Sequence, residues 1–337
     1  AGQKNFYPSK IDGSLITHLN FAFMDVDEKG NLNVCDYWAD FDNPNVGYSV
    51  GSESLYAGVL GAMLLLRQQY PNMKIGISVG GWTRSGAFPK LASTAETRKK
   101  FAQNIAKFVH YYGYDFVDID WEYPTADRDP DPEGNGVAID KGCKGSAADT
   151  QNYTLLLQAI RDALDSYGAK DDKHYELSVA MSASPKMMAA IEYEKVLKIV
   201  DFANMMTYDL NGAWGGFTAH QTALYTNPAY DEGDAGLSVD SCIKYLENKY
   251  NVELPKYEKG KGLAIGNLSS QFLAILYLSK LQHYITNNLH IKFINYMDDY
   301  VLIHNSKEYL KNSLELIENK INNEYKLKLN SKKTIIS

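Results

Sequence analysis

The chain has 337 residues, of which 45% are hydrophobic and 22% are charged, and its formal net charge is -7. This length accommodates one large barrel or two ordinary domains, and the composition is typical of a globular protein with a sizeable core. Because neutralising phosphates requires a clustered positive surface, the net negative charge argues against nucleic acid as a partner of the whole chain.

The charge is distributed unevenly along the chain. Residues 1–258 hold 23 Lys and Arg against 35 Asp and Glu, a net of -12, whereas residues 259–337 hold 11 against 6, a net of +5. Every Trp, Arg and Pro also precedes residue 259, while the remainder is rich in Lys, Asn, Ile and Leu. Such a step in composition predicts two segments of different origin.

The sequence shows no sign of a metal site built from cysteine, of a membrane span or of a signal peptide. The three cysteines, Cys35, Cys143 and Cys242, have no C-x-x-C or His-rich spacing, so no zinc site is expected. The most apolar stretch, residues 263–278, is interrupted by four polar side chains, and we expect no membrane partner. Because the chain opens at Ala1 without a Met, we expect that a leader or more of the domain has been removed.

Five short apolar runs, each followed by polar or helical sequence, divide the first segment. These predicted strands span residues 15–26, 73–82, 114–124, 175–184 and 200–209. Between them, amphipathic patterns predict helices over residues 94–113 and 150–168, each closing on a glycine. Alternating strands and helices form a parallel sheet, either doubly wound or closed into a barrel, so the fold class is α/β.

Polar and aromatic residues at the ends of several predicted strands favour the barrel. Trp82 ends the second run, Glu122 lies near the end of the third, and Tyr208 and Asp209 end the fifth. Active sites of TIM barrels lie at this carboxyl edge of the strands. The Asp-, Gly- and Pro-rich residues 127–149 are predicted to form a long surface loop after the third strand.

The third run carries three acidic residues in alternation, Asp118, Asp120 and Glu122, with apolar side chains between them. A strand places these carboxylates on one face and the apolar residues on the other. The alternative is a polar edge strand with its carboxylates in solvent, but an apolar opposite face favours a covered strand. Burial and like charges raise a carboxyl pKa toward the range of a general acid, and Glu122, nearest the strand end, is the predicted proton donor.

Residues 115–124, DFVDIDWEYP, match the pattern D-x-x-D-x-D-x-E and resemble the signature of family 18 of the glycoside hydrolases, the chitinases and their relatives. SVGG at residues 78–81 and MTYD at residues 206–209 are similar to two further features of this family. The resemblance covers residues 1–256. It implies a (β/α)8 TIM barrel, chitin or N-acetylglucosamine oligosaccharides as partners, secretion, and neither cofactor nor metal. Only five strands are recognisable, so we expect an incomplete barrel, truncated at both ends.

The resemblance also implies a retaining, substrate-assisted mechanism in which the sugar's own N-acetyl group replaces a protein nucleophile. Glu122 would act as general acid and base on the β-1,4 bond. Asp120 would bind the acetamido N–H, and Asp118 would share a proton with Asp120. Tyr208 would donate its hydroxyl to the acetamido oxygen, and Asp209 would help to hold the sugar.

Four further residues are expected to bind substrate. Gly81 and Met206 belong to the two additional family features, while Trp82 and Trp214 offer flat aromatic faces that suit stacking on sugar rings. Ordinary packing at the rim of the barrel is the alternative for both tryptophans.

The tail is predicted to form a helix over residues 268–288, a hairpin over 291–305, a helix over 306–325 and a final short strand. Residues 259–337 resemble the palm of reverse transcriptases from group II introns and retron-like elements, in which Asp298 and Asp299 of the Tyr-x-Asp-Asp turn would bind Mg²⁺. The predicted domains are therefore a truncated TIM barrel over 1–256, a junction over 257–262, and a small α+β palm-like fragment over 263–337.

Two alternatives to chitin hydrolysis remain at this point. The chain is either a catalytically inactive chimera or chitin-binding remnant, or a fragment of an RNA-directed DNA polymerase. The presence of Glu122 argues against a binding remnant, because lectin-like members of the family typically lose the acid. Polymerase activity is disfavoured, because the resemblance includes neither the third metal-binding aspartate of the palm nor the nucleotide-gripping fingers.

Overall fold

The computed structural model describes residues 6–51, 54–131, 140–212, 214, 219–226, 237–250, 281–282, 284–296 and 299–325. The chain forms two compact units, Ala1–Glu253 and Leu254–Ser337. The predicted junction, residues 257–262, lies outside the described residues. None of the helices within the described ranges is long and apolar enough to cross a membrane.

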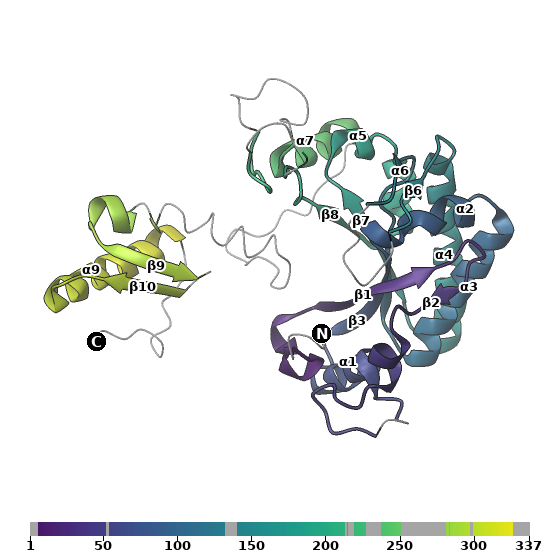
Figure 1. Cartoon of the computed structure of the whole chain (residues 1–337), viewed down its shortest axis with the longest axis horizontal. Coiled ribbons are helices and arrows are strands. Elements are labelled where there is room, and N and C mark those ends of the chain that lie inside the picture. Colours follow the sequence, from purple (N-terminus) through teal and green to yellow (C-terminus); the bar gives the residue numbers. More distant parts are fainter. Residues whose placement is uncertain are drawn as a thin grey trace. The chain divides into compact units, whose positions relative to one another are not determined.

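The first unit is built on a sheet whose parallel strands follow one another in chain order, with the short β2 at the outer side of β1 (Figure 1). Within the described residues the order is β2 (Leu32–Asn33), β1 (His18–Val26), β3 (Lys74–Gly80), β4 (Phe116–Asp120), β7 (Glu176–Ser182) and β8 (Phe202–Met206). All neighbours pair in parallel except β2, which is antiparallel to β1. The five predicted strands are confirmed. A doubly wound sheet reverses its order, whereas the parallel strands of this sheet are each added at the same edge, as in a barrel wall. Closure into a barrel stays a prediction.

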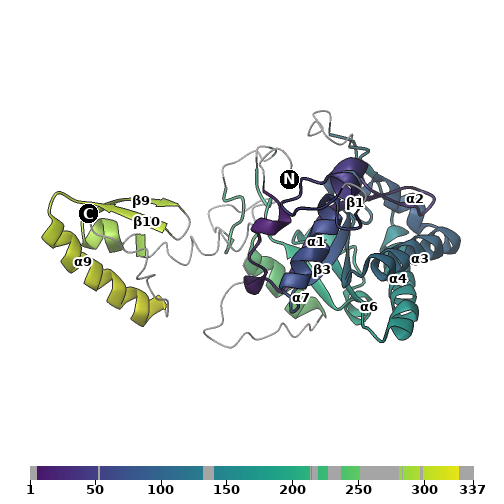
Figure 2. The same cartoon turned by 90° about the horizontal axis from the view of Figure 1, so that it is seen from below.

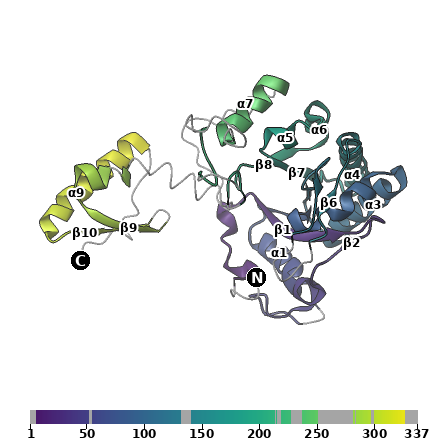
Figure 3. The same ribbon diagram turned by 45° about the horizontal axis from the view of Figure 1, so that its top comes forward.

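Helices cover the outer face of this sheet, with α3 and α4 side by side (Figure 2). They are α1 (Gly58–Gln69), α2 (Phe88–Ala92), α3 (Ala95–Tyr112), α4 (Asp149–Asp171), α5 (Pro185–Met188), α6 (Tyr193–Ile199) and α7 (Val239–Tyr250). Figure 3 shows α5, α6 and α7 beyond β7 and β8. Shorter turns of helix are Pro8–Lys10, Gly13–Leu15, Trp38–Asp42 and Trp82–Ala87, and the loop after β4 carries β5 (Asp127–Arg128) and β6 (Cys143–Lys144).

Helix α3 begins and ends at the predicted signals. Thr94 Oγ1 accepts a hydrogen bond from the Thr97 N–H at 3.2 Å, and Gly113 ends the helix with a left-handed φ of 72°. Helix α4 departs from prediction, because it continues past Gly168 to Asp171. A Cβ on Gly168 would lie 2.3 Å from the Lys173 carbonyl oxygen, so this glycine makes room for the returning chain rather than ending the helix.

The second unit, within its described residues, holds a hairpin and a helix around a small hydrophobic cluster of its own. Strand β9 (Lys292–Tyr296) is antiparallel to β10 (Asp299–Ile303), and α9 (Lys307–Lys320) continues into a π-helical turn, Ile321–Tyr325. The predicted hairpin and second helix are confirmed. Of the first predicted tail helix, the structure describes a π-helical turn at Tyr284–Asn288, and the final strand lies outside the described residues. Asp298 is also outside them, and Asp299 begins β10.

A network of charges ties the amino edge of the sheet together at Asp115. Its carboxylate accepts hydrogen bonds from the Ile75 N–H at 2.9 Å, from Arg67 at 3.1 Å and from Lys173 at 2.6 Å. Burial by itself would raise the pKa of Asp115, but the bonds from Lys173 and Ile75 and the charge of Arg67 outweigh it, so the pKa is lowered. Asp115 therefore stabilises the fold in its ionised form.

Asp115→Asn is expected to lower the free energy of unfolding at pH 7 by about 2 kcal/mol, because two partly buried cations lose their counter-charge. Because the folded pKa is lowered, this contribution is complete above the unfolded pKa of about 3.9 and is lost as pH falls through the folded pKa. Urea denaturation at pH 7 and at about pH 3 measures the difference. Asp165→Asn, which removes an exposed partner of Arg161, is the control and should cost under about 0.5 kcal/mol. An equal loss for Asp115→Asn at both pH values would contradict the assignment.

Candidate active site

The carboxylate-bearing strand lies inside the sheet. Strand β4 pairs with β3 on one side and with β7 on the other, and all five of its residues are buried. The alternative of a polar edge strand with its carboxylates in solvent is therefore wrong. Asp118 and Asp120 lie on the strand, and Glu122 follows two residues after its end.

Asp118 is held by hydroxyl groups from both neighbouring strands. Ser78 Oγ donates to its Oδ2 at 2.7 Å and Ser178 Oγ donates to its Oδ1 at 2.6 Å. Burial raises the pKa of Asp118, and hydrogen bonds from Ser178, Ser78, Asn204 and Asn20 partly offset this rise. Sequence reasoning missed these four partners. The available signal was one polar residue within each of the predicted strands on either side, those that became β1, β3, β7 and β8.

Asp120 is the least satisfied of the three acidic side chains. It is 5% exposed, and its Oδ1 is buried without a hydrogen-bond partner within the described residues. Burial raises the pKa of Asp120 well above its ordinary value, and the charges of Glu122 and Asp118 add to the rise. Burial and the neighbouring acidic groups therefore favour the protonated form of Asp120. Its Oδ1 remains available to bind a group of the substrate.

The backbone of Glu122 is held by a hydrogen bond, and the surroundings of its side chain shift its pKa. Its N–H donates to Ser85 Oγ at 2.8 Å. Burial raises the pKa of Glu122, while a hydrogen bond from Tyr123 and the charge of Arg128 lower it and the charge of Asp209 raises it. The net pKa is raised, which gives this carboxyl the proton that a general acid requires.

Tyr123 was not predicted, although it follows the general acid directly. Its hydroxyl bonds Glu122 and Ser182, and burial and the charge of Glu122 raise the pKa of Tyr123. Its ring lies edge-on to Trp82, with 6.4 Å between the ring centroids. Tyr123 thus connects the general acid to the aromatic rim.

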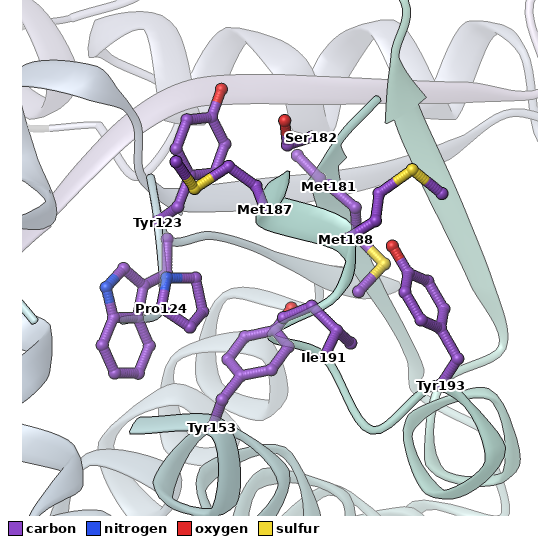
Figure 4. A pocket seen from close by; sticks show the side chains of 11 residues that line it. Tyr123, Pro124, Tyr153, Met181, Ser182, Met187, Met188, Ile191 and Tyr193 are labelled. Atoms are coloured by element: carbon purple, nitrogen blue, oxygen red, sulfur yellow. The ribbon is translucent and has the colours of Figure 1, made fainter. Parts of the chain in front are cut away.

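A small cavity beside the end of β4 is lined by residues other than the carboxylates, and Figure 4 shows its lining side chains. Trp121, which alternates with the acidic residues and faces the helices, belongs to its wall, whereas Asp118, Asp120 and Glu122 do not. The other lining residues are mostly apolar: Tyr123, Pro124, Tyr153, Ala180, Met181, Ser182, Met187, Met188, Ile191 and Tyr193. The reacting groups therefore lie on the opposite face of β4.

The structure brings Tyr208 and Asp209 to the carboxylates from the end of β8. Burial and the charges of Asp120 and Glu122 raise the pKa of Tyr208 to about 12, so its hydroxyl remains a donor. Asp209 adopts a left-handed φ of 50° and accepts a hydrogen bond from Gln221. Met206 is buried at the last position of β8.

The glycines of the SVGG segment allow a close approach between β3 and β4. The Gly81 N–H donates to the Asp120 carbonyl at 2.7 Å, with Gly81 at a φ of 89°. A Cβ on Gly80, whose φ is 114°, would lie 2.1 Å from the same carbonyl oxygen. The chain then turns so that Trp82 begins a 3-10 helix instead of ending the strand as predicted. The hydrogen bond of Gly81 thus joins the end of β3 to the backbone of β4.

The two predicted sugar-stacking tryptophans have different surroundings. Trp82 is 40% exposed and lies beside Tyr123. Trp214 is 69% exposed, and its ring lies against Gly212, where a Cβ would be 2.3 Å from the indole. Within the described part of the chain no contact joins Trp214 to the carboxylates. Trp82, but not Trp214, is thus linked to Glu122, through the side chain of Tyr123.

Comparison with known proteins shows the family to which the chain is related. The chain matches the glycosyl hydrolases family 18 over residues 1–326. It is 37% identical over 264 residues to Chitinase 1 of Aphanocladium album, covering 75% of this chain and 57% of that protein. It is 36% identical over 256 residues to Chitinase A1 of Niallia circulans, covering 67% and 35% of the two chains.

The fold is similar to that of solved chitinases. Chitinase ChiA74 from Bacillus thuringiensis superposes with a TM-score of 0.64 at 32% identity, covering 73% of this chain and 44% of that one. The Group IV chitinase of Ostrinia furnacalis, solved with allosamidin, gives 0.57 at 26% identity, covering 72% and 57% of the two chains. The chain thus spans between about a third and just over half of the length of these relatives. On the family match and the β4 signature together, it belongs to the glycosyl hydrolases of family 18.

Proposed function

We propose that this chain hydrolyses the β-1,4 glycosidic bonds of chitin or chitooligosaccharides with retention of configuration. The observation that carries this proposal is the row of Asp118, Asp120 and Glu122, in which burial raises the pKa of every member. Such a row can hold a proton for the leaving group near neutral pH and present a buried acceptor to the substrate.

In the proposed reaction Glu122 begins protonated. It gives its proton to the glycosidic oxygen as the carbonyl oxygen of the sugar's N-acetyl group attacks the anomeric carbon, so the glycosidic bond breaks and a cyclic cation forms. Glu122, now a carboxylate, takes a proton from water, and the water oxygen opens the cyclic cation from the face that the leaving group left. No protein nucleophile and no cofactor take part.

The neighbouring residues have distinct roles in this scheme. Asp120 binds the acetamido N–H and stabilises the cation, which suits its unpartnered Oδ1. Asp118 shares a proton with Asp120, and Tyr208 donates its hydroxyl to the acetamido oxygen. Asp209 helps to hold the sugar. The raised pKa of Tyr208, about 12, keeps that donor protonated at any pH at which the enzyme works.

Four residues are proposed to contact the substrate around this centre. Trp82 and Trp214 would stack on sugar rings, and Gly81 and Met206 would contribute contacts at the ends of β3 and β8. The exposure of both indoles supports stacking, and the position of Trp82 beside Tyr123 makes it the stronger candidate. We further propose secretion, in keeping with a polymeric substrate.

Glu122→Gln is expected to abolish release of a fluorophore from a chitobiose glycoside, because the amide has no proton of suitable pKa to give the leaving group. General acid catalysis accelerates such reactions about 10²- to 10⁴-fold, so kcat of the variant should be at least about a hundredfold lower than that of the wild type. Glu96→Gln, an exposed substitution in the first turn of α3, is the control and should retain full activity. Equal turnover by the Glu122 variant would contradict the proposed mechanism. Retention on chitin without turnover by the wild type would instead support a binding remnant.

The double variant Ser78→Ala with Ser178→Ala should have a lower free energy of unfolding, because Asp118 loses both of its hydroxyl donors. Each substitution leaves a buried carboxylate oxygen without a hydroxyl donor, which costs about 1 to 3 kcal/mol per site and raises the pKa of Asp118 further. Urea denaturation measures the stability, with Ser93→Ala, whose hydroxyl bonds a carbonyl near the surface, as the control. A double variant as stable as the control would show that the two bonds do not support Asp118.

For the domain organisation we propose an incomplete (β/α)8 barrel over residues 1–256, a junction over 257–262, and a palm-like fragment over 263–337. A separate hydrophobic cluster and the β9–β10 hairpin, which contains the Tyr-x-Asp-Asp turn, support a distinct second part. The family 18 match competes with this attribution, since it extends through the hairpin to residue 326.

We expect no Mg²⁺-dependent primer extension from the purified chain, even at high protein concentration, because one acidic turn fixes two metal ions poorly. Incorporation of a radiolabelled nucleotide on an RNA template and on a DNA template is the measurement. Extension that disappears in Asp298→Ala would contradict this expectation and establish a polymerase activity in the tail.

A further inference from the structure

The loop that follows β4 returns across the rim of the proposed site with a fixed stem. Strands β5 and β6 pair antiparallel, Asp127 opposite Lys144 and Arg128 opposite Cys143. Lys144 bridges Asp127 at 2.8 Å and Asp129 at 2.6 Å on the exposed side of this stem. The position of Arg128 is thus fixed by its own strand pair, independently of any substrate.

Arg128 is held by a buried carboxylate from the other side of the loop. The side chain of Asp140 is 0% exposed, and its oxygens accept bonds from both terminal nitrogens of Arg128. They also accept from the N–H groups of Asp131 at 2.8 Å and Gly142 at 2.9 Å. The pKa of Asp140 is lowered to about 2, and the hydrogen bond from Arg128 contributes most to this lowering. Asp140 therefore remains charged and holds the guanidinium in one orientation.

The guanidinium in turn lies on one face of the Trp82 indole. Arg128 Cζ is 4.0 Å from the centroid of the ring, and Arg128 Nη2 donates to the Trp82 carbonyl at 2.7 Å. The indole edge is also fixed, because Trp82 Nε1 donates to Asp131 Oδ2 at 2.7 Å. One ring face, the ring nitrogen and the backbone of Trp82 are therefore all tied to this loop, while 40% of the residue stays exposed.

We propose that Arg128 and Asp140 form a positioning pair that fixes the Trp82 indole for the sugar and sets a permanent positive charge beside Glu122. The proposal rests on the proposed hydrolysis, in which Trp82 and Glu122 serve the same substrate. A planar guanidinium stacks on an indole and binds a carboxylate with two nitrogens at once, which a lysine cannot do. Orienting the aromatic side chain before the sugar arrives reduces the cost of ordering it on binding.

The same charge acts on the general acid. Burial is the largest cause that raises the pKa of Glu122, and the charge of Asp209, beyond β8, raises it further. The bond from Tyr123, the charge of Arg128 and a bond from the Trp82 backbone N–H lower the pKa, so Glu122 and Arg128 both contact the backbone of Trp82. Asp120 on β4 is the acidic neighbour of Glu122. Removing the charge of Arg128 removes one of the three influences that lower the pKa of Glu122 and leaves the two hydrogen bonds in place. The pKa of Glu122 in such a variant should rise, so the proton needed for catalysis would persist to higher pH.

The test compares Arg128→Met, Arg128→Lys and a control, Arg67→Met, which removes an ion pair at the opposite edge of the sheet. Each full-length protein is labelled with 5-fluorotryptophan, and Trp82→Phe assigns the fluorine resonance of Trp82. Both Arg128 variants should shift and broaden that resonance, whereas the control should leave it unchanged. The result does not require turnover, so it is informative even if the chain is inactive.

Kinetics on a chitobiose glycoside then separates stacking from charge. Both Arg128 variants should raise KM about fivefold, the equivalent of a stacking loss of about 1 kcal/mol. Only Arg128→Met should move the alkaline limb of the profile of kcat/KM against pH upward, because lysine retains the charge. Unchanged Trp82 resonances in both Arg128 variants, or an alkaline limb that moves equally in Arg128→Lys and Arg128→Met, would overturn the proposal. Shifted resonances with no turnover in the wild type would instead refute the proposed hydrolysis and leave the positioning pair intact.

Discussion

Desolvation of the carboxylates on β4 is the constraint on which the rest of the site depends. The strand lies between β3 and β7, and Asp118 and Asp120 are 3% and 5% exposed, so these carboxyl groups have lost most of their water. An ionised carboxylate in such a position is costly unless donors or cations surround it. The neighbouring side chains either supply those donors or leave the carboxyl group protonated.

The three carboxyl groups are compensated to different degrees, and Asp120 in the middle is compensated least. Asp118 has hydroxyl donors from both flanking strands, whereas one oxygen of Asp120 has no partner within the described residues. Glu122 has a bond from Tyr123 and a nearby cation in Arg128. All three groups have a raised pKa, but Asp118 has both oxygens hydrogen-bonded, whereas Asp120 keeps one oxygen without a partner in the described part of the chain. Perturbed carboxyl groups of this kind cluster at functional sites.

Acidic residues at the two edges of the sheet have pKa values shifted in opposite directions. Asp115, directly before β4, has a lowered pKa because Lys173 and Arg67 surround it, and it stabilises the fold as an anion. Asp120, five residues later, has no such cation and its pKa is raised. One strand therefore has an ionised, stabilising carboxylate at its amino end and carboxyl groups with raised pKa at its carboxyl end, the end at which the proposed function places catalysis.

The sequence by itself determined the elements and the row of carboxylates, because both follow from local periodicity. Alternation along residues 116–122 placed the acidic side chains on one face, and the caps of α3 at Thr94 and Gly113 were readable from residue type. Only the tertiary structure decided which groups surround that row. Ser78 and Ser178 lie 40 and 60 residues from Asp118 along the chain, and Arg128 meets Trp82 across 46 residues. Such pairs depend on strand register and on the path of the loops, which no local sequence pattern encodes. The same holds for Gly168, which lies inside α4 because the backbone at Lys173 packs against it.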